Sequence, residues 1–444
     1  MTAAWKLLIC LVPMTLAAVE YRAGIARIKI TPDKPIWLSG YASRTRPSEG
    51  VAADLWAKAL AIEDAKGNRI VIVTADVIGL PRSITDPVAA RTGLDRSRLV
   101  FNSSHTHSGP VLQGNLTAMY DLSPEDLARV RAYSVKLADD LFTVIGAALG
   151  DLQPAVLSYA EGSAYFAVNR REPTPKGIRI GVNPEGPRDT AVPVLKVAAP
   201  DGTLRAVLFG YACHNTTLGG DFYRISGDYA GFAQAEFEKT HPGVAALFLQ
   251  LCGGDINPNP RGTLALAERH GRALAAEVDR VLSTRMQPVR GTIRSALQIV
   301  EPGFAHYTRE TFENRLNHAN AARARNARLH LKAMDEGRSI RRIQYPVQAV
   351  RFGKSLTLVA LGGEVVVDYA LRIKRDYRAA REPIIVAGYS NDVMCYIPSL
   401  AVLKEGGYEA MDSMDFYGMP GPFDETVEET IFRSLKSVLK RLGR

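Results

Sequence analysis

The segment Leu99-Val-Phe-Asn-Ser-Ser-His105-Thr-His107-Ser-Gly-Pro110 joins a short apolar run to a polar loop that carries two histidines. The apolar run predicts a buried strand, and the Ser, Gly and Pro residues predict that the chain turns soon after it. On an extended backbone, His105 and His107 face the same side. One imidazole could therefore bind a metal while the other transfers a proton or contacts a substrate. An isolated histidine is more often structural, but this pair in such a loop favours a functional site.

Five further apolar runs along the chain are also followed by polar residues. In open α/β sheets, ligands bind beyond the carboxyl ends of the strands, so we expect these loops to meet at one edge of a sheet. The runs and their polar residues are Ile70–Thr74 with Asp76, Val207–Tyr211 with His214, Val244–Leu251 with Asp255 and Asn257, Leu356–Leu361 with Glu364, and Ile384–Val386 with Asn391, Asp392 and Tyr396.

Strand-like runs alternate with helical patterns from Ala23 onward, without an internal repeat or a low-complexity linker. This alternation predicts one α/β domain, with a mixed β-sheet core flanked by helices and loops that converge on the site. The clearest helix follows Ser123, a typical N-cap, begins with Pro124 and runs to about Leu149. We expect further helices over Tyr229–Lys239, Leu264–Leu282 and Arg309–Lys332, the last as an exposed excursion, and an amphipathic helix from Ile431 to Leu442. Packing on the domain is favoured for that terminal helix over docking on a membrane.

The first 18 residues have the composition of a secretory signal peptide. Lys6 precedes the apolar run Leu7–Leu16, which contains Pro13 and is shorter than the roughly 20 apolar residues of a spanning helix. A buried first helix is the alternative, but polar residues at 20–22 close the run. We therefore expect residues 1–18 to be a cleaved leader, residues 19–444 to form a catalytic domain, and the mature protein to be exported to the periplasm or out of the cell.

The composition is that of an ordinary globular protein, with 46% hydrophobic and 23% charged residues among 444. The formal net charge is +9, and the cations are spread along the chain rather than gathered in one block. Nucleic-acid binding is therefore not indicated. A diffuse basic surface could favour peripheral contact with an anionic lipid surface, although such a surplus is more often only a solvated surface.

Removal of the leader leaves three cysteines, Cys213, Cys252 and Cys395, an odd number that excludes a fully paired disulfide scaffold. Each lies close in sequence to a candidate site residue, which leaves a thiolate metal site open. We expect the simpler role, because a buried free cysteine commonly behaves as a small hydrophobic residue. Adjacent residues on an extended backbone also face opposite sides, so Cys213 and His214 would rarely bind one ion together.

His214 and Glu364 would complete a metal site with the histidine pair. A catalytic zinc commonly takes three protein ligands and leaves a position for water, whose pKa then falls to about 7. Glu364 is the strongest carboxylate candidate, because Gly362 and Gly363 would let the backbone approach closely. An exposed acidic turn is equally compatible with the sequence at that position.

Several motifs, in order along nearly the whole mature chain, resemble the neutral (non-lysosomal) ceramidase family. Each motif alone is weak, but their order is specific. The motifs are Ala23–Pro32, Ser39–Tyr41 and Trp56–Asp64 in the N-terminal region, His105–Pro110, Val168–Arg170, His214 with Ser226–Asp228, Gly254–Asn259, and Cys395–Ile397 with Gly407–Glu409.

The resemblance implies roles for individual residues. It implies that zinc is bound by His105, His214, Glu364 and Tyr396, and that the reacting amide is contacted by His107, Arg170 and Tyr408. The remaining histidines match no such motif and are interpreted as structural or exposed: His241, His270, His306, His318 and His330.

This sequence departs from the family pattern in two ways. Asn257 stands where the family has a serine regarded as catalytic, and a carboxamide cannot act as a nucleophile. The chain also ends soon after the tyrosine region, so we expect it to lack the family's C-terminal immunoglobulin-like domain. Both departures weaken the case for long-chain ceramide as the substrate.

The resulting hypothesis is a zinc-dependent hydrolase that cleaves the N-acyl amide bond of ceramide or a ceramide-like lipid with metal-activated water. Arg170 and Tyr408 would stabilise the oxyanion, a role in which one donor contributes about 3 kcal/mol. His107 would pass a proton to the leaving amine, and Asn257 would orient the substrate.

Three alternatives stay open from sequence. The protein could carry a metal and bind a lipid or glycan without turnover, because a fold does not guarantee its usual function. It could hydrolyse an ester or a different amide. It could also be a secreted structural protein whose polar loops are incidental, which predicts that those loops lie far apart.

Overall fold

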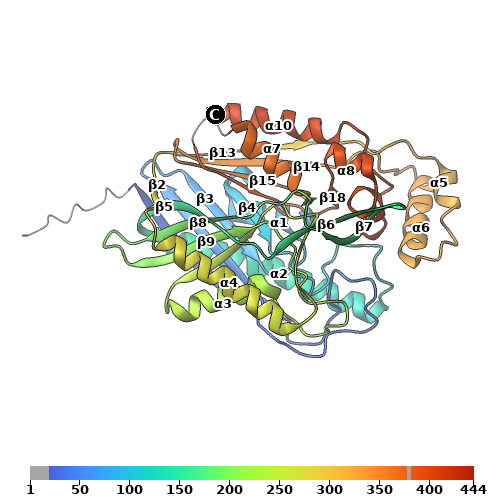
Figure 1. The fold of residues 1–444 in the computed structure, drawn as a ribbon, viewed down its shortest axis with the longest axis horizontal. Coiled ribbons are helices and arrows are strands. Elements are labelled where there is room, and N and C mark those ends of the chain that lie inside the picture. Colours follow the sequence, from blue (N-terminus) through green and yellow to red (C-terminus); the bar gives the residue numbers. More distant parts are fainter. Residues whose placement is uncertain (1–19, 378–381) are drawn as a thin grey trace, which may run out of the picture.

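The computed structural model describes residues 20–377 and 382–444 (Figure 1). The predicted signal peptide at residues 1–18 lies outside the described residues. Within the part of the chain that the structure describes, helices long and apolar enough to cross a membrane are absent.

A large mixed sheet forms the first half of the core, in the strand order β10-β9-β8-β5-β1-β2-β3-β4, with β12 paired to β5. Its β3–β4 and β9–β10 pairs are parallel. The edge strands β4 and β10 approach each other: the side chain of Asn102 donates to the carbonyl of Gln250 at 3.1 Å and accepts from its N–H at 2.8 Å. The strands are β1 Tyr21–Lys29, β2 Trp56–Asp64, β3 Arg69–Ala75, β4 Leu99–Ser103, β5 Gln153–Ser163, β8 Ala191–Ala198, β9 Leu204–Tyr211, β10 Ala245–Gln250 and β12 Gln287–Val289.

A second sheet, in the order β13-β14-β15-β17, lies against the first, and its β15–β17 pair is parallel. Two short sheets, β11-β6-β7 and β16-β18, stand beside the junction of the larger ones. The strands are β13 Ile293–Val300, β14 Tyr345–Phe352, β15 Leu356–Leu361, β17 Ile384–Ala387, β6 Ala167–Thr174, β7 Gly177–Asn183, β11 Ile256–Pro258, β16 Glu364–Val365 and β18 Tyr396–Ile397.

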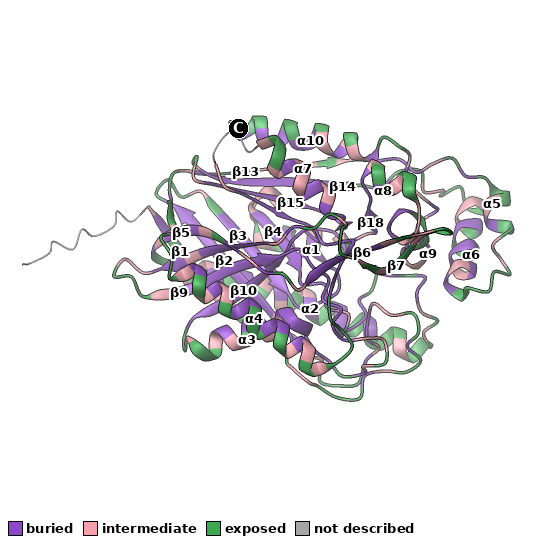
Figure 2. Ribbon diagram, viewed as in Figure 1, coloured by how far each residue is buried: buried purple, intermediate pink, exposed green. Residues whose placement is uncertain are grey.

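The two main sheets share an apolar core, in which Ile72 and Val100 of one sheet join Leu358 and Ile385 of the other. Helices cover the outer face of each sheet, so the molecule has four layers: helices, two sheets and helices. The strands are buried, whereas the outer sides of the helices are exposed (Figure 2). The predicted mixed α/β class is confirmed. The helices are α1 Arg82–Thr92 and α2 Pro124–Gly150 over β2–β4, α3 Asp228–Thr240 and α4 Leu264–Leu282 over β8–β10, and α7 Val367–Tyr377 and α10 Val427–Arg441 over the second sheet.

Most of the predicted helices are present. The Oγ of Ser123 accepts from the N–H of Asp126 at 3.1 Å, which caps α2 as expected. Helices α3 and α4 lie where the sequence placed them. The apolar face of α10, including Ile431, Leu435 and Val438, is buried on the domain, in agreement with packing rather than membrane docking.

The prediction of a single helix over residues 309–332 is wrong. The structure has two helices there, α5 Arg309–Glu313 and α6 Ala321–Asp335. Asn320 separates them, because its side-chain oxygen accepts from the N–H of Ala322 and so begins a new helix. One face of α6 is buried, so the segment is not a simple exposed excursion. The remaining short helical elements are a 3₁₀ turn at Arg96–Arg98, α8 Leu400–Glu405, a π-helical turn at Tyr408–Asp412 and α9 Met414–Tyr417.

Candidate metal centre

Four side chains from four distant stretches of the sequence meet at the junction of the two main sheets. Glu364 Oε2 lies 2.9 Å from Nε2 of His105 and 3.1 Å from Nε2 of His214. The hydroxyl of Tyr396 lies 3.1 Å from Nε2 of His214. The histidines follow β4 and β9 of the large sheet, whereas Glu364 and Tyr396 pair with each other in the β16–β18 ladder. The structure therefore brings together the four residues that the sequence singled out as ligands.

The outer nitrogen of each imidazole is fixed by a backbone carbonyl. Nδ1 of His105 lies 2.6 Å from the carbonyl of Ile78, and Nδ1 of His214 lies 2.7 Å from that of Gly253. Because a carbonyl only accepts, each Nδ1 carries the proton and donates it. The lone pair on each Nε2 is then directed at Glu364, which is the arrangement of metal-binding histidines.

This donor set fits a divalent cation. Burial, followed by the charge of Arg170, lowers the pKa of His214 to about 3, so this ring is neutral. Lone pairs therefore face a carboxylate oxygen that has no hydrogen-bond donor among the described residues. Tetrahedral ligands at zinc distances lie about 3.3 Å apart, close to the separations observed here.

The backbone conformation of the histidine loop differs from the predicted one. The expectation of extended backbone is wrong, because His105 has a φ of 64°, in the left-handed region. His107 still points inward, with its Nε2 3.1 Å from Nε2 of His105. Gly40 makes room for it, since a Cβ there would lie 2.3 Å from Nδ1 of His107. The ring nitrogens of His105, His107 and His214 lie within 4.8 Å of one another, so His107 could also supply a ligand atom.

The glycines before Glu364 have the role that the sequence suggested. Gly363 has a φ of 72°, and a Cβ at this position would lie 2.7 Å from the carbonyl of Cys395. The N–H of Glu364 donates to the same carbonyl at 2.9 Å. Because Glu364 is only 2% exposed, the alternative of an exposed acidic turn is wrong.

The predicted amide-contacting residues lie beside the four candidate ligands. Arg170 Nη2 donates to the hydroxyl of Tyr396 at 2.9 Å, and Nη1 donates to Oδ1 of Asn257 at 3.3 Å. The same oxygen of Asn257 accepts from the hydroxyl of Thr216 at 3.2 Å. The guanidinium also lies 5.5 Å from the ring of Tyr408, whose pKa is raised by burial, so that this phenol keeps its proton for donation.

With this geometry established, the comparisons place the chain among known proteins. Residues 21–292 match the model of the neutral/alkaline non-lysosomal ceramidase N-terminal region. The chain belongs to this family. It is 27% identical over 265 residues to the neutral ceramidase of Pseudomonas aeruginosa, and 26% identical over 270 residues to that of Drosophila melanogaster. These matches cover 54% and 56% of this ceramidase-family chain but only 37% of each relative.

The fold agrees with the same family. The crystal structure of the Pseudomonas aeruginosa neutral ceramidase superposes with a TM-score of 0.75 at 20% identity. The superposition covers 96% of this ceramidase-family chain and 75% of the solved one.

Three residues of this ceramidase-family site were missed from sequence. Tyr417 donates its hydroxyl to Oε1 of Glu364. The ring of Tyr389 packs 4.5 Å from that of His105. Glu409 contacts Arg170. Asp255, by contrast, was among the polar residues expected after a strand, and it accepts from the N–H of Val367 at the start of α7. No periodicity or motif distinguishes the two tyrosines, whereas Glu409 is directly next to the predicted Tyr408 and could have been inferred from it.

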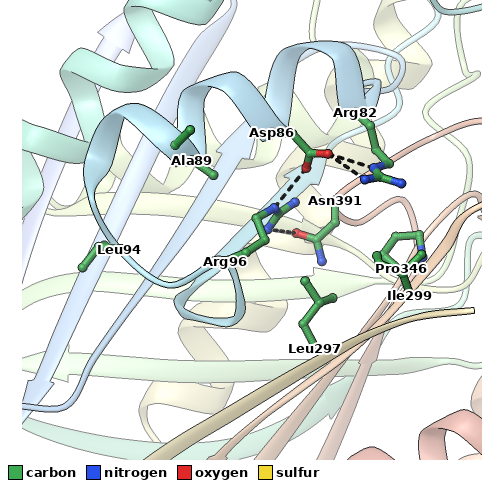
Figure 3. Close-up of a pocket in the computed structure, with 10 residues that line it drawn as sticks. Arg82, Asp86, Ala89, Leu94, Arg96, Leu297, Ile299, Pro346 and Asn391 are labelled. Carbon is green, nitrogen blue, oxygen red and sulfur yellow. Dashed lines mark hydrogen bonds and ion pairs between the residues drawn. The ribbon is translucent and has the colours of Figure 1, made fainter.

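Not all polar residues after strands join the centre. Asp76 accepts from the N–H of Trp56, and Asp392 accepts from that of Arg82, so both hold backbone instead. Asn391 lines a separate surface pocket of about 430 Å³, where Asp86 pairs with Arg82 and Arg96 above aliphatic side chains (Figure 3). The expectation that all these loops meet is therefore only partly right.

The cysteines and two of the remaining histidines have structural surroundings. Cys213, Cys252 and Cys395 are buried and form no disulfide among the described residues, in agreement with the role of small hydrophobic residues. Of the histidines outside the motifs, His270 and His330 are buried against the carbonyls of Pro260 and Gly418.

Proposed function

We propose that the protein is a zinc-dependent amidohydrolase that cleaves the N-acyl amide bond of ceramide or a ceramide-like lipid. The observation that carries the proposal is the convergence of two Nε2 lone pairs, a carboxylate and a phenol, with a guanidinium and a second phenol next to them. His105, His214, Glu364 and Tyr396 would hold the cation. When bound, it supplies the Lewis-acid chemistry that makes water a nucleophile at neutral pH.

The residues around the cation have distinct chemical tasks. His107 directs Nε2 at the same point, and burial, followed by His105 and His214, lowers its pKa well below the usual value. It is therefore neutral and can accept a proton from water and deliver it to the leaving amine. Arg170 and Tyr408 can donate to the carbonyl oxygen as negative charge develops on it, where one well-placed donor contributes about 3 kcal/mol.

Asn257 has a positioning role in this proposal. A carboxamide cannot attack a carbonyl, so water rather than a side chain at this position is the nucleophile. Its Oδ1 already accepts from Arg170 and Thr216, which leaves the amide N–H groups to donate to a substrate.

The lipid class of the substrate is inferred from the neutral ceramidases that the chain resembles. Surface features support it: Ile180 and Val182 are about half exposed on β7, which pairs with the strand that carries Arg170. These side chains could contact a lipid surface. We also propose that residues 19–444 form one exported catalytic domain. A hydrolase of another amide or of an ester is the second candidate, favoured by Asn257.

Metal content and hydrolysis of N-acyl amides test the assignment together. We expect His105→Ala and Glu364→Ala each to abolish bound zinc and turnover. His107→Ala should retain zinc and lose about 10²–10⁴-fold in kcat, the usual contribution of a general acid–base residue. His241→Ala is the matched control, because this ring lies at the end of α3 and contacts Asp279. Full zinc content in both ligand variants would refute the metal site.

Asn257→Ser probes the substrate class separately. If the wild-type protein cleaves ceramide and the variant does so at a similar rate, ceramide-like lipids are the substrate. If ceramide cleavage occurs only in the variant, the natural substrate is a different amide or ester.

A further inference from the structure

Two neighbouring arginines of β6 contact one buried carboxylate, which a regular strand would not allow. Successive side chains of a strand face opposite sides. Arg170 Nε nevertheless lies 2.7 Å from Oε1 of Glu409, and Arg171 Nη1 lies 2.6 Å from Oε2 of the same residue. The pairing of β6 with β7 is irregular between Asn169 and Arg171, where Arg170 lies opposite two residues of β7, and both arginine side chains reach the same carboxylate at this irregularity. Bulges beside active sites commonly redirect a side chain in this way.

The bulge is fixed by its own hydrogen bonds. The N–H of Arg170 donates to the carbonyl of Asp255 at 2.8 Å, and that of Arg171 donates to Oδ1 of Asn169 at 2.9 Å. Asn183 on β7 donates from Nδ2 to the carbonyl of Arg171 at 2.9 Å. The irregular backbone is therefore an ordered part of the fold, and Arg170 leaves it in a defined direction.

The carboxylate also comes from irregular backbone. Glu409 lies in the π-helical turn Tyr408–Asp412, and such turns are frequent at functional sites. Gly406 and Gly407 precede it with φ of 74° and 82°, and a Cβ on Gly407 would lie 3.1 Å from Cβ of Ile178 on β7. The turn thus packs closely on the β6–β7 hairpin, and Glu409 is 1% exposed.

The nitrogens of the Arg170 guanidinium have two kinds of partner, a carboxylate and residues of the candidate site. Nε is held by Glu409, while Nη1 and Nη2 are directed at Asn257 and Tyr396. A guanidinium is planar, so fixing Nε fixes the direction of the other two nitrogens. We propose that Glu409 is a positioning residue of the hydrolytic site, whose carboxylate holds Arg170 so that Nη1 and Nη2 face Asn257 and Tyr396.

The kinetic consequence of this proposal rests on the proposed function, but the structural consequence does not. The alternative is that Glu409 only neutralises two buried arginines and contributes to folding. Glu409→Gln is nearly isosteric and removes the charge. Glu405→Gln is the matched control, since Glu405 has a 52% exposed side chain and contacts Arg171 but not Arg170.

Crystal structures and kinetics of these variants decide between the two roles. In Glu409→Gln we expect Arg170 Nη2 to leave hydrogen-bond range of Tyr396, kcat to fall at least tenfold, KM to stay within twofold and zinc content to be unchanged. Glu405→Gln should change neither the position of Arg170 nor kcat. Glu409→Asp should retain more kcat than Glu409→Gln, because charge rather than shape holds the guanidinium. This second variant also provides the test if Glu409→Gln does not fold.

A double-mutant cycle shows whether Glu409 acts through Arg170. In an Arg170→Lys background, Glu409→Gln should change kcat less than twofold. Losses that multiply in the double variant, or an unmoved Arg170 in the structure of Glu409→Gln, would overturn the positioning role. If the wild-type protein hydrolyses no N-acyl amide or ester, the proposed function fails, and the crystal structures still decide the role of Glu409.

Discussion

At the scale of single residues, the ability of a side chain to bind a metal depends on its hydrogen-bond partners as much as on its own chemistry. His105 and His214 could be selected from sequence because each follows an apolar run and lies among small polar residues. The tautomers of the two rings could not be predicted, because they depend on the backbone carbonyls of Ile78 and Gly253. Ile78 lies 27 residues from His105 in the sequence. The hydrogen bond from Tyr417 to Glu364 spans 53 residues and has no local signal at all.

Tyr417→Phe tests the contribution of that hydrogen bond. Tyr417 donates to Oε1 of Glu364, which leaves Oε2 directed at the two histidines. Partners that orient a metal ligand typically contribute 10–100-fold to metal affinity, so we expect zinc affinity to fall by about that factor while the fold is kept. Competition with a chromophoric chelator measures it.

The matched control is Tyr369→Phe, because Tyr369 is also buried but donates to the carbonyl of Pro398. Its zinc affinity should equal that of the wild type. Unchanged affinity in Tyr417→Phe would show that packing alone orients Glu364.

At the scale of elements, local signals succeeded where the element decides its own boundaries. Ser123 and Pro124 alone predict where α2 begins, and α4 ends where its apolar pattern ends. The break between α5 and α6 was missed because helical spacing continues through it while Asn320 caps the second helix. The pairing of Glu364 with Tyr396 across β16 and β18 was not predictable, because it depends on which sheet each strand joins.

Helix α6 stabilises the segment that carries Tyr417. Arg323 reaches from this helix to Asp412 at 2.9 Å and to Asp415 at 2.5 Å, and Asp415 is buried. Removing Arg323 takes away the nearest cation of the buried Asp415 carboxylate, so Arg323→Ala should loosen the segment from Tyr408 to Gly418. Hydrogen exchange should then be faster in this segment. Arg328→Ala, on the exposed side of the same helix, should leave it unchanged. Equal protection in both variants would show that α6 has no such role.

At the scale of the whole molecule, the candidate centre lies where two sheets meet, and this explains what sequence could and could not provide. Composition and alternating patterns predicted an α/β fold, and the order of several motifs indicated the family. The face-to-face packing of the sheets was not predicted, because the shared core joins residues as far apart in sequence as Ile72 and Ile385. The site depends on that packing, since His105 and His214 belong to loops of one sheet and Glu364 follows a strand of the other.

A cation held between the sheets should therefore stabilise the whole fold rather than one loop. A ligand that binds only the native state stabilises it by RT ln(1 + [L]/Kd), about 2.7 kcal/mol at a free concentration of 100 times Kd. We expect chelation to lower the Tm of the wild-type protein and added zinc to restore it, with one unfolding transition in both states. His105→Ala should show a Tm that zinc and chelator do not change, because one of the facing lone pairs is gone. A wild-type Tm independent of zinc would show that the four side chains pack together without holding a metal. A zinc-dependent rise in Tm of equal size in His105→Ala would show that the stabilising cation binds elsewhere on the molecule.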